Sequence, residues 1–254
     1  MNIADKAVYS EDKGLLLFGD SFEFSLVAAM SSRLDGNMSL AYGDTGNALN
    51  NRENFLKKHH LDFRELVCAK QTHSANVRYV TEEDKGKGAL VYETAIDDTD
   101  AFITDKKNVP ISIYTADCLP VFLYEPYKQV IGLVHGGWRS SAKNIAVFTV
   151  KMMQERFSID PKKLLVAFGP GIRACCFEAE EEFKSIFPGD TQERNGKLYV
   201  DLAGANRRQL LKSGVVLENI FDYRICTACG VKNFYSFRAE KDKSGRMIAV
   251  MMLV

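Results

Sequence analysis

Short apolar runs, separated by charged or glycine-containing segments, recur along the chain. The runs at residues 111–114, 121–124 and 130–134 are rich in Val, Ile, Leu, Phe and Tyr, a pattern typical of buried strands. On the same grounds, further strands are predicted at residues 15–18, 66–70, 101–103, 164–168, 220–225, 234–237 and 247–253.

Segments with helical periodicity alternate with these runs. The longest covers residues 138–157 and carries an apolar stripe from Ala142 to Met153, with Ser140 or Ser141 as the expected cap. Because strands and helices interleave without a repeat or a clear linker, the predicted fold class is α/β with a mixed sheet, in a single domain over residues 1–254. Shorter helices are predicted at residues 45–60, 178–187 and 202–213.

Bulk composition limits the function without defining it. Lys and Arg together number 33, as do Asp and Glu, so the net charge is zero and gives no global argument for a nucleic-acid or membrane partner. No apolar run approaches the roughly 20 residues of a membrane-spanning helix, and the first residues lack a signal-peptide core. A cytoplasmic protein is therefore expected, with its six cysteines reduced.

One stretch concentrates the chemically active residues. Cys118 lies between two predicted strands, and His135 closes the strand predicted at residues 130–134. Gly136 and Gly137 follow at once, so the backbone is able to turn sharply there and approach a ligand closely. A thiol, an imidazole and the start of a helix are expected to form a site at one corner of the α/β fold.

The chain has only four histidines, and this number narrows the choice of site residues. His59 and His60 lie at the end of a predicted helix, where a cationic side chain complements the helix dipole. His73 and His135 remain, each after a strand-like segment, and with Cys118 they make a possible His/Cys/His set. Taken singly, each residue has an ordinary alternative role. His73 would be a surface loop histidine, His135 a hydrogen-bonding residue, and Cys118 a small buried hydrophobe.

Two imidazoles and one thiolate are typical zinc ligands, and three protein ligands leave the fourth position open for water or substrate. The predicted metal and catalytic residues are therefore His73, Cys118 and His135. Without a metal, Cys118 and His135 are instead able to form a thiolate–imidazolium nucleophile.

Two other groups of residues suggest metal sites less strongly. Cys226 and Cys229 form a Cys-x-x-Cys pair that would make a structural zinc site together with Cys175 and Cys176. Adjacent cysteines are awkward ligands for one ion, so packing roles are predicted for these four. The carboxylates of residues 97–100 match no calcium loop and are predicted to form a capped or solvated turn.

Several motifs, in a fixed order along the chain, resemble those of the YfiH/YlmD family, whose members are often labelled polyphenol oxidase or laccase-domain proteins. These motifs are Lys70-Gln71-Thr72-His73, Thr99-Asp100-Ala101-Phe102-Ile103-Thr104, Ala116-Asp117-Cys118-Leu119-Pro120-Val121, His135-Gly136-Gly137-Trp138-Arg139, Gly169-Pro170-Gly171-Ile172, Cys176-Phe177-Glu178, Cys226-Thr227, Ser236-Phe237-Arg238 and Gly245-Arg246-Met247.

The resemblance implies layered mixed sheets flanked by helices, similar to the catalytic domain of cytotoxic necrotising factor. It also implies a purine nucleoside phosphorylase acting on adenosine, inosine, guanosine or S-methyl-5'-thioadenosine, with adenosine deaminase activity, zinc as cofactor and phosphate as co-substrate. The family's metal ligands fall on His73, Cys118 and His135. Thr72 and Ser140 stand where the family usually has valine and glycine, a difference that would alter substrate preference without removing the metal.

Four further residues are candidates for substrate binding. Arg139, at the expected helix start, and Arg238 suit a phosphate, because guanidinium groups and helix N-termini favour anions; a structural salt bridge is the alternative for Arg139. Asp117 is a candidate for orienting a ligand or acting as general base, and otherwise for capping backbone amides. Gln71 is a candidate for contacting substrate, or for holding the loop that presents His73.

Three other functions compete with the nucleoside enzyme. A multicopper polyphenol oxidase (laccase) needs a histidine-rich cluster that four histidines cannot supply, although copper remains an alternative metal at a His/Cys/His site. The resemblance also admits a Cys-His hydrolase acting on cell-wall precursor peptides. The non-enzymatic alternative is a zinc-stabilised scaffold. The sequence gives no indication of oligomeric state.

Overall fold

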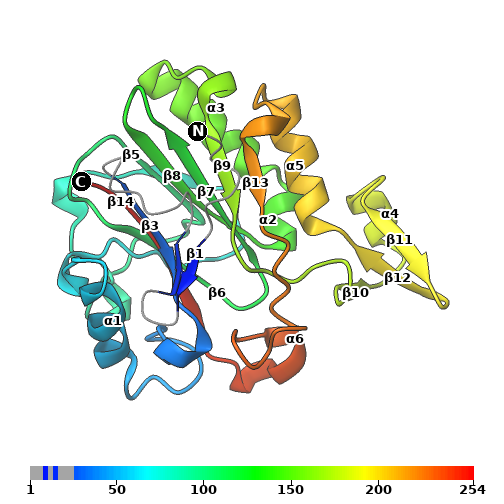
Figure 1. Ribbon diagram of the computed structural model, residues 1–254, viewed down its shortest axis with the longest axis horizontal. Helices are drawn as coiled ribbons and strands as arrows, with labels where there is room; N and C mark the ends of the chain where they lie inside the picture. Colours follow the sequence, from blue (N-terminus) through cyan, green and yellow to red (C-terminus); the bar gives the residue numbers. More distant parts are fainter. Residues whose placement is uncertain (1–7, 11–13, 17–25) are drawn as a thin grey trace.

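The computed structural model describes residues 8–10, 14–16 and 26–254 (Figure 1). Its strands form two large sheets and a small one, with helices on the outer faces, as the predicted fold class requires. The five-stranded sheet has the order β1 (Val8–Ser10), β2 (Gly14–Leu16), β3 (Leu26–Met30), β14 (Met247–Leu253) and β6 (Ile111–Thr115). The six-stranded sheet has the order β13 (Ile220–Asp222), β9 (Leu165–Phe168), β7 (Leu119–Glu125), β8 (Val130–Gly136), β5 (Ala101–Thr104) and β4 (Val77–Tyr79).

The small sheet and its neighbouring helix α4 project from one side of the molecule (Figure 1). This sheet has the order β10 (Glu178–Ala179), β12 (Lys197–Val200) and β11 (Thr191–Arg194). The helices are α1 (Ala48–Lys57), α2 (Trp138–Ala142), α3 (Ile145–Phe157), α4 (Phe183–Ile186), α5 (Leu202–Lys212) and α6 (Phe237–Glu240). No helix in the described part of the chain is long and apolar enough to cross a lipid bilayer.

The two large sheets pack against each other through one apolar face of each. In β14, Met247, Ala249 and Met251 belong to the core between the sheets, whereas Ile248 and Val250 belong to the cluster that includes the buried face of α1. Successive residues of a strand point to opposite faces, so β14 is apolar throughout because both of its faces are covered.

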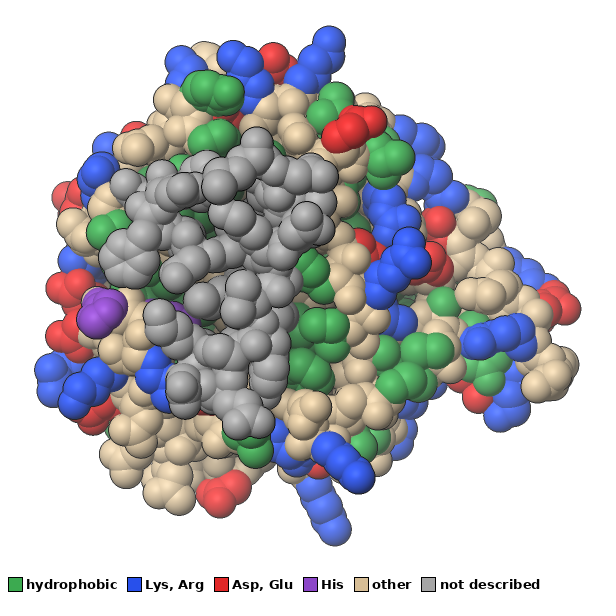
Figure 2. Space-filling model, in the orientation of Figure 1, with side chains coloured by type: hydrophobic (Ala, Val, Ile, Leu, Met, Phe, Trp, Pro, Cys, Tyr) green, Lys and Arg blue, Asp and Glu red, His purple; other side chains and the backbone are tan. Residues whose placement is uncertain are grey.

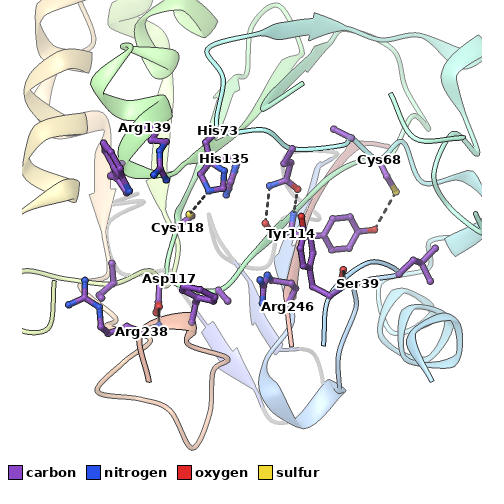
Figure 3. A pocket seen from close by; sticks show the side chains of 18 of the residues that line it. Ser39, Cys68, His73, Tyr114, Asp117, Cys118, His135, Arg139, Arg238 and Arg246 are labelled. Atoms are coloured by element: carbon purple, nitrogen blue, oxygen red, sulfur yellow. Dashed lines mark hydrogen bonds between the residues drawn. The ribbon is translucent and has the colours of Figure 1, made fainter. Parts of the chain in front are cut away.

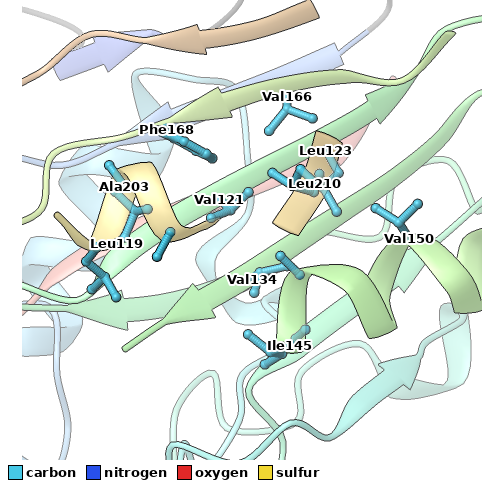
Figure 4. Packing of buried hydrophobic residues seen from close by; sticks show 14 of the residues in the cluster. Leu119, Val121, Leu123, Val134, Ile145, Val150, Val166, Phe168, Ala203 and Leu210 are labelled. Carbon is cyan, nitrogen blue, oxygen red and sulfur yellow. The ribbon is translucent and has the colours of Figure 1, made fainter. Parts of the chain in front are cut away.

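A second core lies between the six-stranded sheet and the helices α3 and α5 (Figure 4). Leu119, Val121 and Leu123 of β7 are fully buried there beside Val150 of α3 and Leu210 of α5. Each buried side chain of this size contributes about 1.5–3 kcal/mol of hydrophobic stabilisation. This core fixes β7 and β8, whose ends carry the candidate site.

The helix predicted over residues 138–157 is two helices. α2 ends at Ala142 and α3 begins after Asn144, whose φ of 61° lies in the left-handed region and interrupts the helical backbone. Ala142 is exposed, so it does not begin the predicted apolar stripe, whereas Thr149 and Met153 are buried on it.

Other predicted elements differ at the edges of the fold. Residues 66–70 form only isolated bridges, through Val67 and Ala69, rather than a strand, and residues 234–237 lead into α6 instead of forming a strand. The helix predicted at residues 178–187 is confirmed only over α4, because its first residues pair with β12. β2 covers the first two residues of the strand predicted at residues 15–18. Residues 17 and 18 lie outside the described residues.

Candidate metal centre and substrate pocket

The register of two antiparallel strands brings Asp100 and His135 together. Ala101 of β5 lies opposite Val134 of β8, so the residues one step beyond this pair are also neighbours. The backbone N–H of His135 donates to the Asp100 carbonyl at 2.8 Å, and its Nδ1 donates to Asp100 Oδ1 at 2.7 Å. Both residues are buried. This bond commits Nδ1 and leaves Nε2 as the nitrogen for a metal.

Cys118 and His73 reach the same place from different parts of the chain. Cys118 lies where the chain passes from β6 in one large sheet to β7 in the other, two residues before Pro120, which pairs with His135. His73 lies in the loop before β4 and has a left-handed φ of 58°. The ligand atoms of His73, Cys118 and His135 all lie within 4.8 Å of one another (Figure 3).

This donor set fits a zinc ion. The distance from Cys118 Sγ to His73 Nε2 is 3.6 Å, and a tetrahedral zinc with ordinary Zn–S and Zn–N bonds separates such atoms by about 3.6 Å. His135 has the carboxylate partner that orients metal-binding imidazoles in many proteins. The arrangement therefore fits three zinc ligands with the fourth position open toward the pocket.

Asp100 is the structural centre of this group, a role that the sequence did not indicate. Besides His135, its carboxylate accepts hydrogen bonds from the backbone N–H groups of Thr72 (3.1 Å), His73 (3.1 Å) and Ser74 (2.7 Å). It therefore holds one ligand directly and fixes the loop that presents another. Of the two alternatives predicted for residues 97–100, Asp100 has the capping role and is completely buried rather than solvated; its contact with His135 was not predicted.

Gly137 permits the close approach of two ligands. A Cβ atom added there would lie 2.6 Å from His73 Cδ2 and 3.1 Å from Cys118 Sγ, so any larger residue would displace a ligand. Gly137, rather than Ser140 or Ser141, is also the N-cap of α2.

Ser140 has a different role from the predicted cap. Its hydroxyl donates to the carbonyls of His135 (2.8 Å) and Gly137 (3.0 Å). These bonds fix the turn between β8 and α2, so Ser140 supports the candidate metal centre from behind without facing the pocket as a ligand.

In the metal-free protein Cys118 and His135 form a charged pair. Burial alone would raise the pKa of the Cys118 thiol, but His135 and His73 outweigh it and lower this pKa to about 6. Burial would lower the pKa of His135, but Cys118 and Asp100 raise it to about 9. A thiolate beside an imidazolium is therefore favoured near neutral pH.

A cavity of about 650 Å³ opens over these residues, within the range usual for small-molecule sites. Aromatic and basic side chains line much of it. They include Tyr42, Tyr92, Tyr114, Trp138, Phe177, Phe237, Arg139, Arg238, Lys241 and Arg246. Basic side chains are concentrated along the cavity. On the outer surface, by contrast, basic and acidic side chains are interspersed on the face shown in Figure 2.

Two of the predicted substrate residues hold the pocket together. Gln71 makes a pair of hydrogen bonds with the backbone of Tyr114, at 2.7 and 2.9 Å, which fixes the loop before His73. The Asp117 carboxylate accepts hydrogen bonds from Thr227 Oγ1 and from the backbone N–H of Arg238, both at 2.6 Å. These contacts are the structural alternatives considered for Gln71 and Asp117.

The arginines are placed differently. Arg139 lines the cavity, stacks over the ring of Trp138 at 4.2 Å and has no acidic partner among the described residues. Arg238 also lines it, but its guanidinium donates to the carbonyls of Cys176 and Glu178.

Arg246 was missing from the predicted substrate residues, although it lies in one of the quoted motifs. It borders the same cavity, with its guanidinium 4.8 Å from the centre of the Tyr42 ring (Figure 3). The only feature of the sequence that could have identified Arg246 is its position, as a cationic residue directly before the apolar run of β14.

The fold and the site together define an α/β protein with a His/Cys/His centre beneath a basic, aromatic pocket. Residues 30–254 match the family model described as multi-copper polyphenol oxidoreductase laccase, and the chain belongs to this family, in agreement with the predicted YfiH/YlmD assignment.

Named relatives and a solved structure agree with this assignment. The chain is 33% identical over 223 residues to purine nucleoside phosphorylase YlmD of Geobacillus stearothermophilus, covering 84% of this chain and 81% of the relative. It is 32% identical to adenosine deaminase RL5 of an unknown prokaryotic organism, covering 73% and 74%. The crystal structure of the Geobacillus YlmD superposes with a TM-score of 0.92, at 30% identity, over 97% and 98% of the two chains. These relatives support the prediction that the chain is an enzyme.

Proposed function

We propose that the chain is a zinc-dependent purine nucleoside phosphorylase with adenosine deaminase activity, acting as one catalytic domain over residues 1–254. Its substrates would be adenosine, inosine, guanosine and S-methyl-5'-thioadenosine. The observation that carries this proposal is the His/Cys/His centre at the base of a cavity that arginines and aromatic rings line. The names of the relatives, purine nucleoside phosphorylase and adenosine deaminase, supply the substrate class.

His73, Cys118 and His135 would hold the zinc ion, with Asp100 orienting His135. When bound, zinc supplies Lewis-acid chemistry: it polarises an oxygen ligand and lowers the pKa of a water molecule to about 7. Copper at the same ligands is the alternative metal, because imidazole and thiolate bind both ions.

The arginines of the pocket would bind phosphate. A nucleoside carries no charge on its sugar or base, so a cavity with several cations favours an anionic second substrate. Arg139 is the strongest candidate, because its guanidinium meets no carboxylate among the described residues. Arg238 and Arg246 would add positive charge from other sides of the cavity (Figure 3).

The aromatic residues would bind the purine. Offset stacking between aromatic rings is worth about 0.5–1.5 kcal/mol beyond the buried area. A flat heterocyclic base therefore suits the rings of the cavity better than an aliphatic peptide does. Asp117 would act by positioning, because both of its oxygens already accept hydrogen bonds.

The experiment is a product analysis. Purified protein is incubated with adenosine in the presence and absence of phosphate, and adenine, hypoxanthine and inosine are separated by chromatography. The proposal predicts adenine only with phosphate, inosine without it, and loss of both in Cys118→Ala. A folded, zinc-loaded protein that yields neither product would refute the nucleoside assignment.

A Cys-His hydrolase is the second candidate, and one observation favours it. In the metal-free protein the pKa of Cys118 falls to about 6 while that of His135 rises to about 9, which suits a thiolate nucleophile. Chelation separates the two functions: it abolishes zinc-dependent nucleoside turnover, whereas a thiolate hydrolase acting on a cell-wall precursor peptide keeps or gains activity.

A further inference from the structure

Four of the six cysteines meet at a place outside the candidate metal centre. Cys175 and Cys176 lie in the turn after β9, and Cys226 and Cys229 lie in the segment after β13. Their Sγ atoms all lie within 4.8 Å of one another. The Sγ atom of Cys229 is 3.4 Å from that of Cys175 and 3.3 Å from that of Cys176.

The packing roles predicted for these cysteines do not explain this arrangement. Cys175 and Cys229 are exposed, so they gain little from the hydrophobic effect. Adjacent cysteines are ordinarily awkward ligands for one ion. In the turn around Cys175 and Cys176, however, both thiols reach the same partner, Cys229.

The backbone brings the two segments together before any thiol contact is made. β9 and β13 are neighbouring parallel strands, so the segments that follow them leave the sheet at the same edge. Gly171 then forms a parallel bridge with Cys226. The amide of Gly171 donates to the carbonyl of Ile225, and that of Thr227 donates to the carbonyl of Gly171, both at 3.2 Å.

We propose that Cys175, Cys176, Cys226 and Cys229 bind a zinc ion as a closed tetrathiolate site. A tetrahedral zinc with four Zn–S bonds separates its sulfur atoms by about 3.8 Å, and the separations in the structure, from 3.3 Å to at most 4.8 Å, bracket this value. Four protein ligands leave no open position, so the ion is structural. Thiolate ligands favour zinc over hard cations such as magnesium.

A disulfide accounts for the geometry less well. Cys229 contacts both Cys175 and Cys176 at nearly equal distances, so either bond would leave two thiols of the cluster without a role. A single ion uses all four sulfur atoms. Binding releases the thiol protons to solvent and changes no oxidation state.

The ion would fasten one wall of the substrate pocket. Thr227, between the paired cysteines, donates to Asp117 at 2.6 Å, and the carbonyl of Cys176 accepts a hydrogen bond from Arg238 at 3.3 Å. Losing the ion is therefore expected to loosen Asp117 and Arg238 and, resting on the proposed phosphorolytic function, to raise KM for phosphate more than it lowers kcat.

The test uses Cys118→Ser protein, in which the four cysteines are intact and the His/Cys/His centre has lost its thiolate. Cobalt(II) is added to the metal-free, reduced protein, and native mass spectrometry counts the zinc ions in a parallel sample. The proposal predicts one tightly held zinc ion. It also predicts the intense d–d and sulfur-to-cobalt charge-transfer absorption of a tetrahedral tetrathiolate.

Two variants provide the comparison. Cys226→Ser/Cys229→Ser, with Cys118 unchanged, is expected to lose one of two zinc ions and the tetrathiolate spectrum. Cys68→Ser is the matched control, because Cys68 is the cysteine outside both groups, and it is expected to keep both ions.

Three results would overturn the proposal. They are Cys118→Ser protein without bound metal, a cobalt spectrum without thiolate bands, and a disulfide between two of the four cysteines in protein purified under reducing conditions. If the double variant does not fold, the cobalt spectrum of Cys118→Ser protein still tests the proposal, because the Cys118→Ser substitution leaves the four cysteines unchanged.

Discussion

Replacing Asp100 with asparagine is the sharpest perturbation of the candidate metal centre. The change keeps the size of the side chain and removes its charge. It also replaces an oxygen with an NH₂ group in a position where the neighbouring groups are donors. If the amide oxygen continues to accept from His135, the NH₂ group faces the backbone N–H groups of Thr72 and Ser74, now at 3.1 and 2.7 Å from the carboxylate. Two backbone donors, both partly buried, then lose their acceptor.

The structure sets the expected magnitude. Burial would raise the pKa of Asp100, but hydrogen bonds and charge from His135, together with hydrogen bonds from Ser74, lower it to about 2. A depression of this size corresponds to about 2–3 kcal/mol of stability, present above the ordinary pKa near 4 and lost as the pH falls through about 2. With the unsatisfied donors added, Asp100→Asn is expected to destabilise metal-free protein by about 3–5 kcal/mol.

The same variant is expected to weaken zinc binding by about 10–100-fold, because the imidazole of His135 loses the partner that orients it. Urea unfolding of metal-free protein measures the stability change, and competition with a chromophoric chelator measures the affinity. The same competition with Cys118→Ser protein gives the contribution of any zinc bound outside the His/Cys/His centre. Asp97→Asn is the matched control: its side chain is 82% exposed in an ion pair with Lys70, so a change within about 0.5 kcal/mol is expected. An Asp100→Asn protein that binds zinc as tightly as the unchanged chain would refute this role for Asp100.

Three other predictions follow from the same geometry. Gly137→Ala is expected to abolish zinc binding at the centre, because its Cβ would lie 2.6 Å from His73; metal analysis of the folded variant checks this, and full occupancy would contradict it. In metal-free protein, alkylation of Cys118 by iodoacetamide is expected to rise with a midpoint near pH 6, since the thiolate forms above its pKa of about 6. Peptide-resolved mass spectrometry measures it, and a midpoint near the ordinary value of about 8.5 would contradict the ion pair. Arg139→Gln is expected to raise KM for phosphate by about tenfold or more, as for the loss of a charge-assisted hydrogen bond, while the exposed control Arg78→Gln leaves it unchanged; equal KM values in both variants would remove Arg139 from the phosphate site.

The buried strands could be predicted from the sequence because both of their faces are apolar. The runs behind β7, β8 and β14 have no polar alternation, and each is covered by a layer on either side. The break at Asn144 could not be predicted, because in the sequence the spacing of apolar residues from Ala142 to Met153 continues across it. Residues 66–70 are apolar enough for a strand, yet they make only isolated bridges.

The direct site residues could be proposed from the number of histidines and from the motifs, but their partners could not. Asp100 meets His135 through strand register, and register is not visible in a single sequence. Asp117 has the residue type of a general base, yet both of its oxygens accept hydrogen bonds from distant residues, which supports the positioning role proposed for it. The convergence of the four cysteines likewise depends on β9 and β13 being neighbours, although they are distant in sequence.

His73, Cys118 and His135 are proposed to hold the zinc ion of a nucleoside enzyme. The decisive measurement is anomalous diffraction on either side of the zinc absorption edge, using crystals of a preparation that converts adenosine to adenine when phosphate is present. An anomalous peak is expected about 2.0–2.3 Å from two imidazole nitrogens and the Cys118 sulfur. Active crystals without zinc density between these residues would contradict it.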